Sequence, residues 1–215
     1  MMNSDESSPP ASTDKLHRAY HAKDASETEQ VYDDWAAEYE LHMKNVGYTH
    51  PAMVASMAAR HVAPTAAAVL DAGAGTGVLG EILTALGYSN LLGLDASAGM
   101  LKIAGLKKNY RDLSHQFLGQ PLSYSDDYFA LVASSGVFTQ GHAPLQGLDE
   151  LIRVTRPGGH LVFSIARTYL DGPFELKREQ LEQAGLWRFI DASERYNSAP
   201  LGDTLISQVY VFQVS

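Results

Sequence analysis

The hydrophobic pattern of the chain alternates between short apolar runs and longer segments with apolar residues at helical spacing. Runs of strand length lie at residues 66–70, 91–94, 116–118, 128–135 and 160–165, and helical periodicity separates them, for example at 78–83 and 97–104. Buried parallel strands joined by helices give this alternation. Residues 186–196 and 205–214 predict an antiparallel pair at the sheet edge. The pattern predicts an α/β fold with a doubly wound, seven-stranded sheet, mostly parallel with an antiparallel C-terminal strand, and helices on both faces.

The chain divides into a short polar tail and one folded unit. Residues 1–25 are rich in Ser, Pro and Asp, and we expect a disordered or poorly ordered tail there. Residues 26–215 are long enough for a single well-buried α/β domain. Within it, residues 26–62 predict two helices before the first strand, because Ser26 and Glu29 form a capping box and Pro51 suits a first helical turn.

A glycine-rich turn follows the first apolar run. The residues are Asp71, Ala72, Gly73, Ala74, Gly75, Thr76 and Gly77, and a helical segment begins directly after them. Glycines let the backbone turn with positive φ and let a ligand approach closely. In doubly wound folds, ligands bind at this carboxyl end of the strand. Residues 75–80 also match GxGxxG, which alone is a weak dinucleotide signal.

Two carboxylates help to decide whether the ligand is a dinucleotide or a cationic nucleoside. Asp71 at the mouth of the turn would repel a pyrophosphate, but it suits a ligand that carries an ammonium and a sulfonium. Asp95 ends the second apolar run, where an acid can accept both hydrogen bonds of a ribose diol. The pair therefore favours a cationic nucleoside over a dinucleotide.

The D-x-G-x-G-x-G pattern followed by Asp95 resembles motif I and the next acidic motif of class I S-adenosylmethionine (SAM)-dependent methyltransferases. Residues 118–122, 150–159 and 181–187 are similar to the Williams–Beuren syndrome chromosome region methyltransferase-like proteins. The resemblance implies a Rossmann-like fold and SAM as cofactor, with S-adenosylhomocysteine as product. It further implies methyl transfer to a small-molecule acceptor by in-line displacement.

The resemblance also implies a set of donor-binding residues. Residues 32–39 resemble the YDxWAxxYD segment that covers the donor in many small-molecule methyltransferases, with Trp35 expected to pack in the core. Met100 is placed to cover an adenine ring and Gln120 to bond the base, although a core methionine and an ordinary turn are the alternatives. The expected donor contacts are Asp71, Ala72, Gly73, Ala74, Gly75, Gly77, Asp95, Ala96, Met100, Gly119, Gln120, Pro121, Ser135, Tyr32, Trp35 and Tyr39.

Methyl transfer requires that the nucleophile, the methyl carbon and the sulfur lie in line. It requires a base only if the nucleophile arrives protonated. His142, in the loop after the fourth strand, is the candidate base because imidazole titrates near neutral pH; a histidine solvated in that loop is the alternative. Arg167, Tyr169 and Glu175 follow the fifth strand and are weaker candidates for acceptor contacts; a solvated surface position is the favoured alternative for each. The reaction demands no metal, and we expect none.

Composition narrows the function further. The chain has no cysteine, which excludes thiolate nucleophiles and Cys-containing zinc sites, and its net charge of −9 disfavours nucleic acid as the main partner. No apolar run reaches the ~20 residues of a membrane span, and no signal peptide is evident, so we expect a cytoplasmic protein without a membrane partner. Two alternatives stay open: an NAD(P)-dependent reductase, which lacks a Tyr-x-x-x-Lys pair here, and a SAM-binding partner protein without catalysis. The oligomeric state is open as well.

Overall fold

The computed structural model describes residues 25–64, 67–139, 142–170, 172–202 and 204–215, so nearly all of the predicted tail lies outside the described residues. The two predicted N-terminal helices are present. In chain order the elements are α2 (Ala25–Asn45), α3 (His50–His61), β1 (Val69–Ala72), α4 (Val78–Ala85), β2 (Leu91–Asp95), α5 (Ala98–Leu106), β3 (Asp112–His115), β4 (Phe129–Phe138), α6 (Gly147–Val154), β5 (Thr155–Ala166), α7 (Arg167–Leu170), α8 (Pro173–Gln183), β6 (Trp187–Ala192), β7 (Tyr196–Asn197) and β8 (Ile206–Val214).

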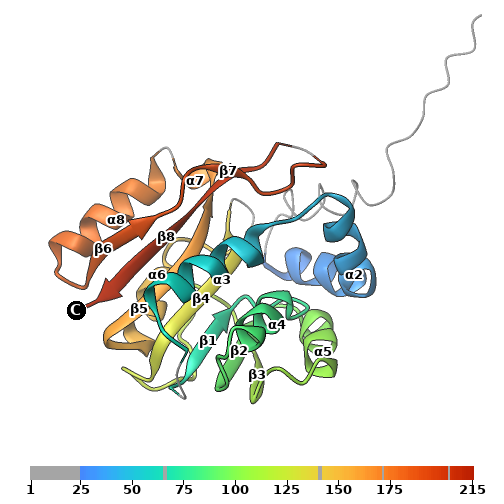
Figure 1. The fold of residues 1–215 in the computed structure, drawn as a ribbon, viewed down its shortest axis with the longest axis horizontal. Helices are drawn as coiled ribbons and strands as arrows, with labels where there is room; N and C mark the ends of the chain where they lie inside the picture. Colours follow the sequence, from blue (N-terminus) through green and yellow to red (C-terminus); the bar gives the residue numbers. More distant parts are fainter. Residues whose placement is uncertain (1–24, 65–66, 140–141, 171, 203) are drawn as a thin grey trace, which may run out of the picture.

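One mixed sheet organises these elements (Figure 1). Its strand order is β3-β2-β1-β4-β5-β8-β6, with β7 beside β8. The strands from β3 to β5 are parallel, and β8 runs antiparallel to its neighbours β5 and β6. The chain order reverses between β1 and β4, which lie side by side with Val69 opposite Leu131. Their carboxyl ends therefore form the crevice where doubly wound folds bind ligands.

The predicted doubly wound fold is confirmed, with three corrections in the strands. The described sheet has eight strands rather than seven, because the two-residue β7 pairs with β8. The third strand is β3 rather than residues 116–118; as an edge strand its side chains are exposed or half-buried, so it carries no apolar run. The fifth strand begins at Thr155, since the predicted turn at residues 156–159 is an irregularity within β5 where Gly158 has φ +75°.

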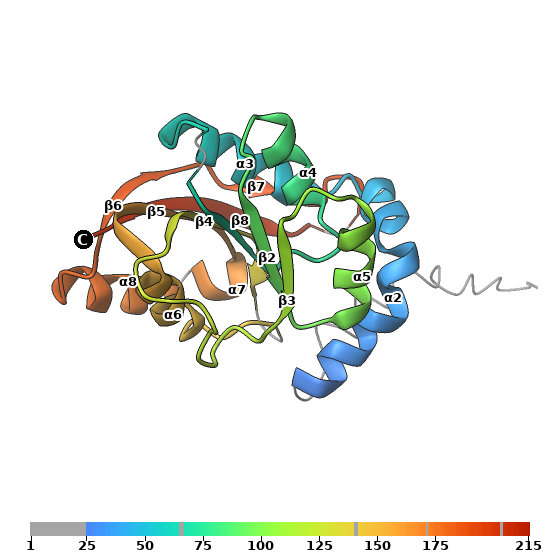
Figure 2. The ribbon, with the colours of Figure 1, turned by 90° about the horizontal axis from the view of Figure 1, so that it is seen from below.

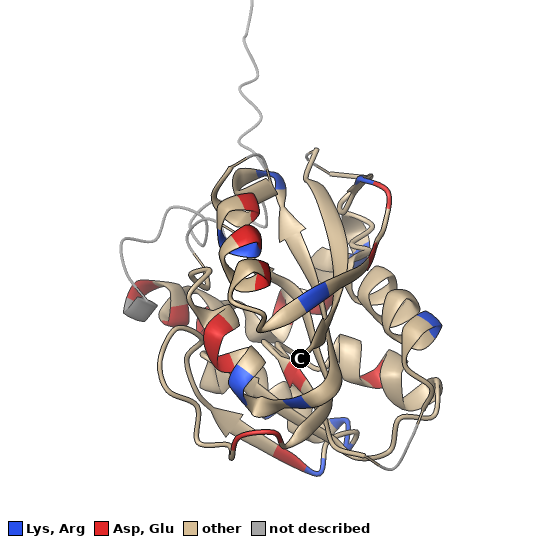
Figure 3. Cartoon of the chain, turned by 90° about the vertical axis from the view of Figure 1, so that its left-hand side faces the viewer, with Lys and Arg blue, Asp and Glu red and all other residues tan. Residues whose placement is uncertain are grey.

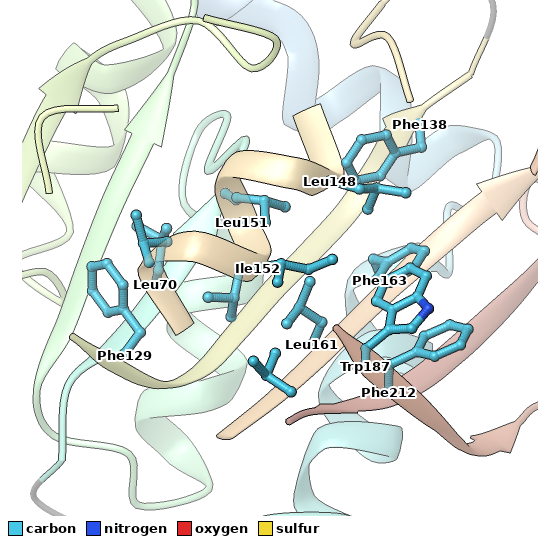
Figure 4. Packing of buried hydrophobic residues seen from close by; sticks show 14 of the residues in the cluster. Leu70, Phe129, Phe138, Leu148, Leu151, Ile152, Leu161, Phe163, Trp187 and Phe212 are labelled. Carbon is cyan, nitrogen blue, oxygen red and sulfur yellow. The ribbon is translucent and has the colours of Figure 1, made fainter. Parts of the chain in front are cut away.

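Helices cover both faces of the sheet (Figure 2). On one face, α6 and α8 bury Leu148, Leu151 and Phe174 against the strands. Aromatic rings fill this layer, and Trp187 stacks on Phe212 with ring centroids 3.9 Å apart (Figure 4). On the other face, α3 and α4 pack on a second apolar cluster. Burial on both faces makes the central strands rigid supports for the loops that follow them.

Helix α2 lies outside these two layers and packs against α5 at the β3 side of the sheet (Figure 1). None of the described helices combines the length and the apolarity that a membrane span requires. The side of the molecule that carries α8 and β6 mixes acidic and basic residues rather than gathering one sign of charge (Figure 3).

Candidate functional site

The glycine-rich turn after β1 is fixed by bonds to the neighbouring strand. The backbone N–H groups of Gly73 and Ala74 both donate to the carbonyl oxygen of Leu94, at 2.9 and 2.8 Å. Gly73 has φ +86°, and a Cβ there would overlap Cγ2 of Val137 from β4. Only glycine satisfies both conditions, so the sequence places this residue where two strand ends meet.

Gly75 and Asp95 face each other across the crevice. The Gly75 N–H donates to Oδ2 of Asp95 at 2.8 Å, and the Ser97 N–H donates to Oδ1 at 2.8 Å. Gly75 has φ +53°, and no atom lies within 4 Å of the position that its Cβ would take. Burial raises the pKa of Asp95, while these two N–H donors act in the opposite direction. The space beside Gly75 is thus open to a ligand next to an oriented carboxylate.

Asp71 lies deeper than the sequence suggested. Its side chain has no exposed surface, and Tyr110 donates a 2.6 Å hydrogen bond to Oδ2. Burial raises the pKa of Asp71 to about 7; the Tyr110 bond counteracts part of this effect, and the charge of nearby Asp95 adds to it. Asp71 is not among the residues that line the cavity described next. Asp95 is not on that lining either, but it is only half-buried and bonds Gly75, which is, whereas Asp71 is fully buried.

A cavity of about 420 Å³, which we call the donor cavity, opens beside the turn. Residues 73–76 and Ser135 form one wall, and Tyr39, Tyr48 and parts of α2, α3 and α4 form the others. Two hydroxyl oxygens on its lining, Oγ1 of Thr76 and Oγ of Ser135, are buried without a hydrogen-bond partner among the described residues. Buried polar atoms are normally bonded, so these atoms are available to a ligand.

Helix α2 closes the crevice from the side. Asp33 accepts hydrogen bonds from Oγ of Ser97 (2.5 Å) and from the N–H of Gly99 (2.8 Å), which ties α2 to the beginning of α5. Trp35 is 1% exposed and packs against Tyr39, as expected. Oη of Tyr32 lies 2.5 Å from Nε2 of His142, so the candidate base contacts the candidate lid.

The remaining predicted donor contacts are not on the lining of the donor cavity. Ala72 and Met100 are buried, and Ala96 uses its carbonyl oxygen to accept a bond from His115. Gly77 begins α4 and packs against Ala104. Gly119 has φ +95° and lies against Pro144, while Gln120 and Pro121 are exposed. The structure therefore gathers Gly73, Ala74, Gly75, Ser135 and Tyr39 at one cavity, with Asp95 at its edge.

A second cavity of about 460 Å³, which we call the β4–β5 cavity, lies past the ends of those two strands. Tyr48 lines both cavities, and the consecutive residues Ser135 and Gly136 line one each. A Cβ on Gly136 would overlap Oη of Tyr48, so these two segments of the chain are in tight contact there. The cavities are neighbours with a thin partition.

The three residues expected to contact the acceptor have different surroundings in the structure. Arg167 lines the β4–β5 cavity. Tyr169 packs against the aromatic core, and Glu175 pairs with Arg178 at 2.8 Å. His50, which the sequence gave no reason to select, is buried in the wall with Nδ1 2.6 Å from Oη of Tyr196. Burial lowers the pKa of His50 to about 4, so its ring is neutral.

Comparison with known proteins adds the family. A family model described as methyltransferase domain matches residues 70–163, from β1 into β5. Human methyltransferase-like protein 27 is 32% identical over 181 residues, which cover 80% of this chain and 73% of that protein. The chain belongs to the SAM-dependent methyltransferases. This confirms the predicted class and the predicted cofactor, and it decides against the reductase alternative and in favour of an enzyme.

A further curated relative is also a methyltransferase, and two solved structures share the fold. Demethylmenaquinone methyltransferase of Clavibacter sepedonicus is 30% identical over 151 residues, 68% of this chain and 61% of that enzyme. The TehB-like SAM-dependent methyltransferase of Corynebacterium glutamicum shares 22% identity with a TM-score of 0.59 over 84% of this chain and 98% of that one. The [4+2]-cyclase SpnF has the same TM-score at 17% identity, over 76% of this chain and 80% of that one. Likeness at such identities shows the fold alone.

The residues of this methyltransferase fit SAM. The empty space at the Cβ position of Gly75 leaves room for a ligand against the main chain. The unpartnered hydroxyls of Thr76 and Ser135 offer polar contacts on the same lining, and the Asp95 carboxylate stands at the edge. The lining also carries the carboxylates of Glu40 and Glu81, which pair with Lys107, and the side chain of Lys44. Close backbone, hydroxyls and nearby carboxylates suit the polar and charged groups of a cationic nucleoside.

Sequence reasoning missed the residues that act from a distance along the chain. Tyr110 binds Asp71, Val137 confines Gly73, and Tyr48 separates the cavities. None of the three belongs to a local motif, so no spacing pattern could have selected them. Asp33 was within reach, since it lies in the aromatic segment that resembled a lid.

Proposed function

We propose that this SAM-dependent methyltransferase acts on a small-molecule acceptor, with the donor in the donor cavity and the acceptor in the β4–β5 cavity. The observation that carries the proposal is the shared wall at Tyr48, which brings two cavities within one side chain of each other. The β4–β5 cavity, at about 460 Å³, has the size of a small-molecule site. Methyl transfer requires such adjacency, because donor and acceptor must meet in line.

The chain's own residues supply the binding and the alignment. The N–H of Gly75 and the carboxylate of Asp95 border the donor's place, with Asp95 suited to the ribose hydroxyls. When bound there, SAM supplies a methyl group on a positively charged sulfonium that a nucleophile displaces in line. Asp71 acts indirectly in this proposal, since its buried carboxylate supports the turn through Tyr110.

Helix α2 excludes water from the crevice in this proposal. Asp33 anchors it to α5, and Trp35 and Tyr39 turn their rings toward the protein. His142 stays the candidate base for a protonated nucleophile, although it is not among the residues that line either cavity and its Nε2 contacts Tyr32. We infer no nucleic-acid partner from the net charge of −9. The cytoplasmic location and the absence of a membrane partner stay predictions.

Isotope transfer tests the acceptor class. The protein is incubated with methyl-labelled SAM and a metabolite extract that still contains protein and nucleic acid, and the label is separated by molecular size. We expect label in the small-molecule fraction and S-adenosylhomocysteine in equal amount. Label that follows protein or nucleic acid, and is released by protease or nuclease, would contradict a small-molecule acceptor. Calorimetric titration with SAM and with NAD, run in parallel, checks the donor site independently.

A further inference from the structure

The β4–β5 cavity differs from the rest of the molecule in its charge. The chain carries 25 acidic and 16 Lys or Arg residues, yet no Asp or Glu lines this cavity among the described residues. Arg167 is its one Lys or Arg side chain. His50 adds no charge, because burial keeps its pKa near 4. Among the described residues of the lining, Arg167 is therefore the one charged side chain, in a protein that is acidic overall.

Arg167 is available to a ligand. It is exposed at the beginning of α7, directly after β5, and it forms no ion pair with the described residues. Other arginines are already bound: Arg153 is held by Glu150 and Asp126, at 2.7 and 2.6 Å. A guanidinium on the lining of a cavity, exposed and without a carboxylate partner in the described part of the chain, can bind a carboxylate of the ligand with two parallel hydrogen bonds.

The neutral polar groups of the wall are largely occupied. Oγ of Ser164 accepts a bond from the N–H of Gly136 at 2.8 Å, and Oγ of Ser198 donates to the carbonyl oxygen of Leu205 at 3.0 Å. His50 contacts Tyr196 on one side and Ser207 on the other. A polyhydroxylated ligand would find few of these groups unbonded, whereas an anion finds an unpaired cation.

We propose that the methyl acceptor is a small carboxylate and that Arg167 is the residue that recognises its carboxyl group. The inference rests on the proposed function, because it names the class of acceptor for the β4–β5 cavity. A single guanidinium matches the single charge of a carboxylate, whereas a phosphate monoester carries about −1.5 to −2 and calls for more donors. The carboxylate lies at the exposed end of the cavity, which leaves the remainder of the acceptor to extend toward the wall shared with the donor cavity.

Binding of matched ligand pairs tests the proposal without relying on turnover. With the donor cavity saturated by S-adenosylhomocysteine, 4-hydroxybenzoate and 3-hydroxybutyrate are titrated beside their primary amides, and dissociation constants are taken from saturation-transfer NMR. The wild type should bind each carboxylate roughly tenfold more tightly than its amide, the size of one charge-assisted contact. Arg167→Gln should abolish that preference. Arg188→Gln is the matched control, since Arg188 lies on β6 and bonds Gln213.

Each outcome decides the matter. Equal binding of acids and amides by the wild type, a preference that survives in Arg167→Gln, or failure of the acids to bind would overturn the assignment of the acceptor class. Normal affinity for S-adenosylhomocysteine in those same samples would leave the donor site standing. If the wild type itself failed to bind S-adenosylhomocysteine, that result would instead contradict the proposed function.

Discussion

The two cavities of this methyltransferase differ in how much of their lining comes from consecutive main-chain residues and how much from side chains of distant segments. The donor cavity takes one wall from four consecutive residues, 73–76, whose main chain is held by Leu94 and Asp95. The β4–β5 cavity takes its wall from distant segments of the chain: residues 48 and 50, 136 and 138–139, 164 and 166–168, and 198 and 204–207. One wall of the donor cavity thus depends on the path of the backbone, whereas the β4–β5 cavity depends on which side chains the fold brings together.

Because of this difference, substitutions should have different effects at the two sites. A backbone cradle binds the same ligand with many side-chain sequences, provided that glycines keep its shape. A cavity walled by side chains can change its ligand through single substitutions, without altering the sheet. We therefore expect mutations of the glycine-rich turn to affect folding and donor binding together, and mutations in the β4–β5 cavity to affect acceptor binding alone.

Gly73→Ala should have the largest effect. The new methyl group would overlap Val137, and the residue would be held at φ +86°, so we expect a loss of about 3–5 kcal/mol in the free energy of unfolding. Gly75→Ala is the matched control, with φ +53° and open space at its Cβ; it should cost about 1 kcal/mol yet still weaken donor binding. Urea denaturation and calorimetry with S-adenosylhomocysteine measure both. Equal losses of stability would contradict the backbone account.

Asp71→Asn should change how stability depends on pH. The pKa of Asp71 rises from an ordinary value of 3.8 to about 7 because the carboxyl group is buried. Between these values the folded protein keeps a proton that the unfolded chain releases, so wild-type stability falls as pH rises through this window. An asparagine has no proton to lose. Relative to the wild type, the variant should gain roughly 2–4 kcal/mol between pH 4 and pH 8.

Chemical denaturation at a series of pH values checks this prediction. Asp112→Asn serves as the control for the loss of one carboxylate, because Asp112 is exposed at the start of β3. If the wild type and Asp71→Asn lose stability in parallel between pH 4 and pH 8, Asp71 does not hold a proton in the folded protein.

Asp95→Ala should weaken donor binding more than it weakens the fold. The carboxylate is suited to the ribose and also orients the Gly75 N–H, so we expect a loss of roughly 1.5–3 kcal/mol in binding of S-adenosylhomocysteine. Asp112→Ala, at the far end of the neighbouring strand, should bind normally. If calorimetry gives Asp95→Ala the same affinity for S-adenosylhomocysteine as the wild type, the donor does not bind in this crevice.

The contrast between the cavities also explains how much the sequence could predict. Gly73, Gly75 and Asp95 follow predicted strands, and strand ends in a parallel sheet meet at one edge, so local pattern was enough to bring them together. Tyr48 and His50 precede the sheet, and their place beside β4 and β5 depends on how α3 packs, which no local spacing encodes. The strand β3 was misplaced for a related reason: an edge strand lacks the continuous apolar run that marks a central one.

Asp33→Ala should have the smallest effect, and it asks whether α2 belongs to the donor cavity. The carboxylate holds Ser97 and Gly99 at the start of α5, so its loss should cost about 1 kcal/mol of stability, as for a helix cap. If α2 covers the donor, S-adenosylhomocysteine should also dissociate faster, while ligands of the β4–β5 cavity keep their affinity. Asp34→Ala is the matched control on the adjacent residue. In the part of the chain that the structure describes, the Asp34 side chain bonds only Gln30. Stopped-flow dissociation rates that are equal in the two variants would mean that α2 stabilises α5 without gating the donor, because a lid that is loosened must release its ligand sooner.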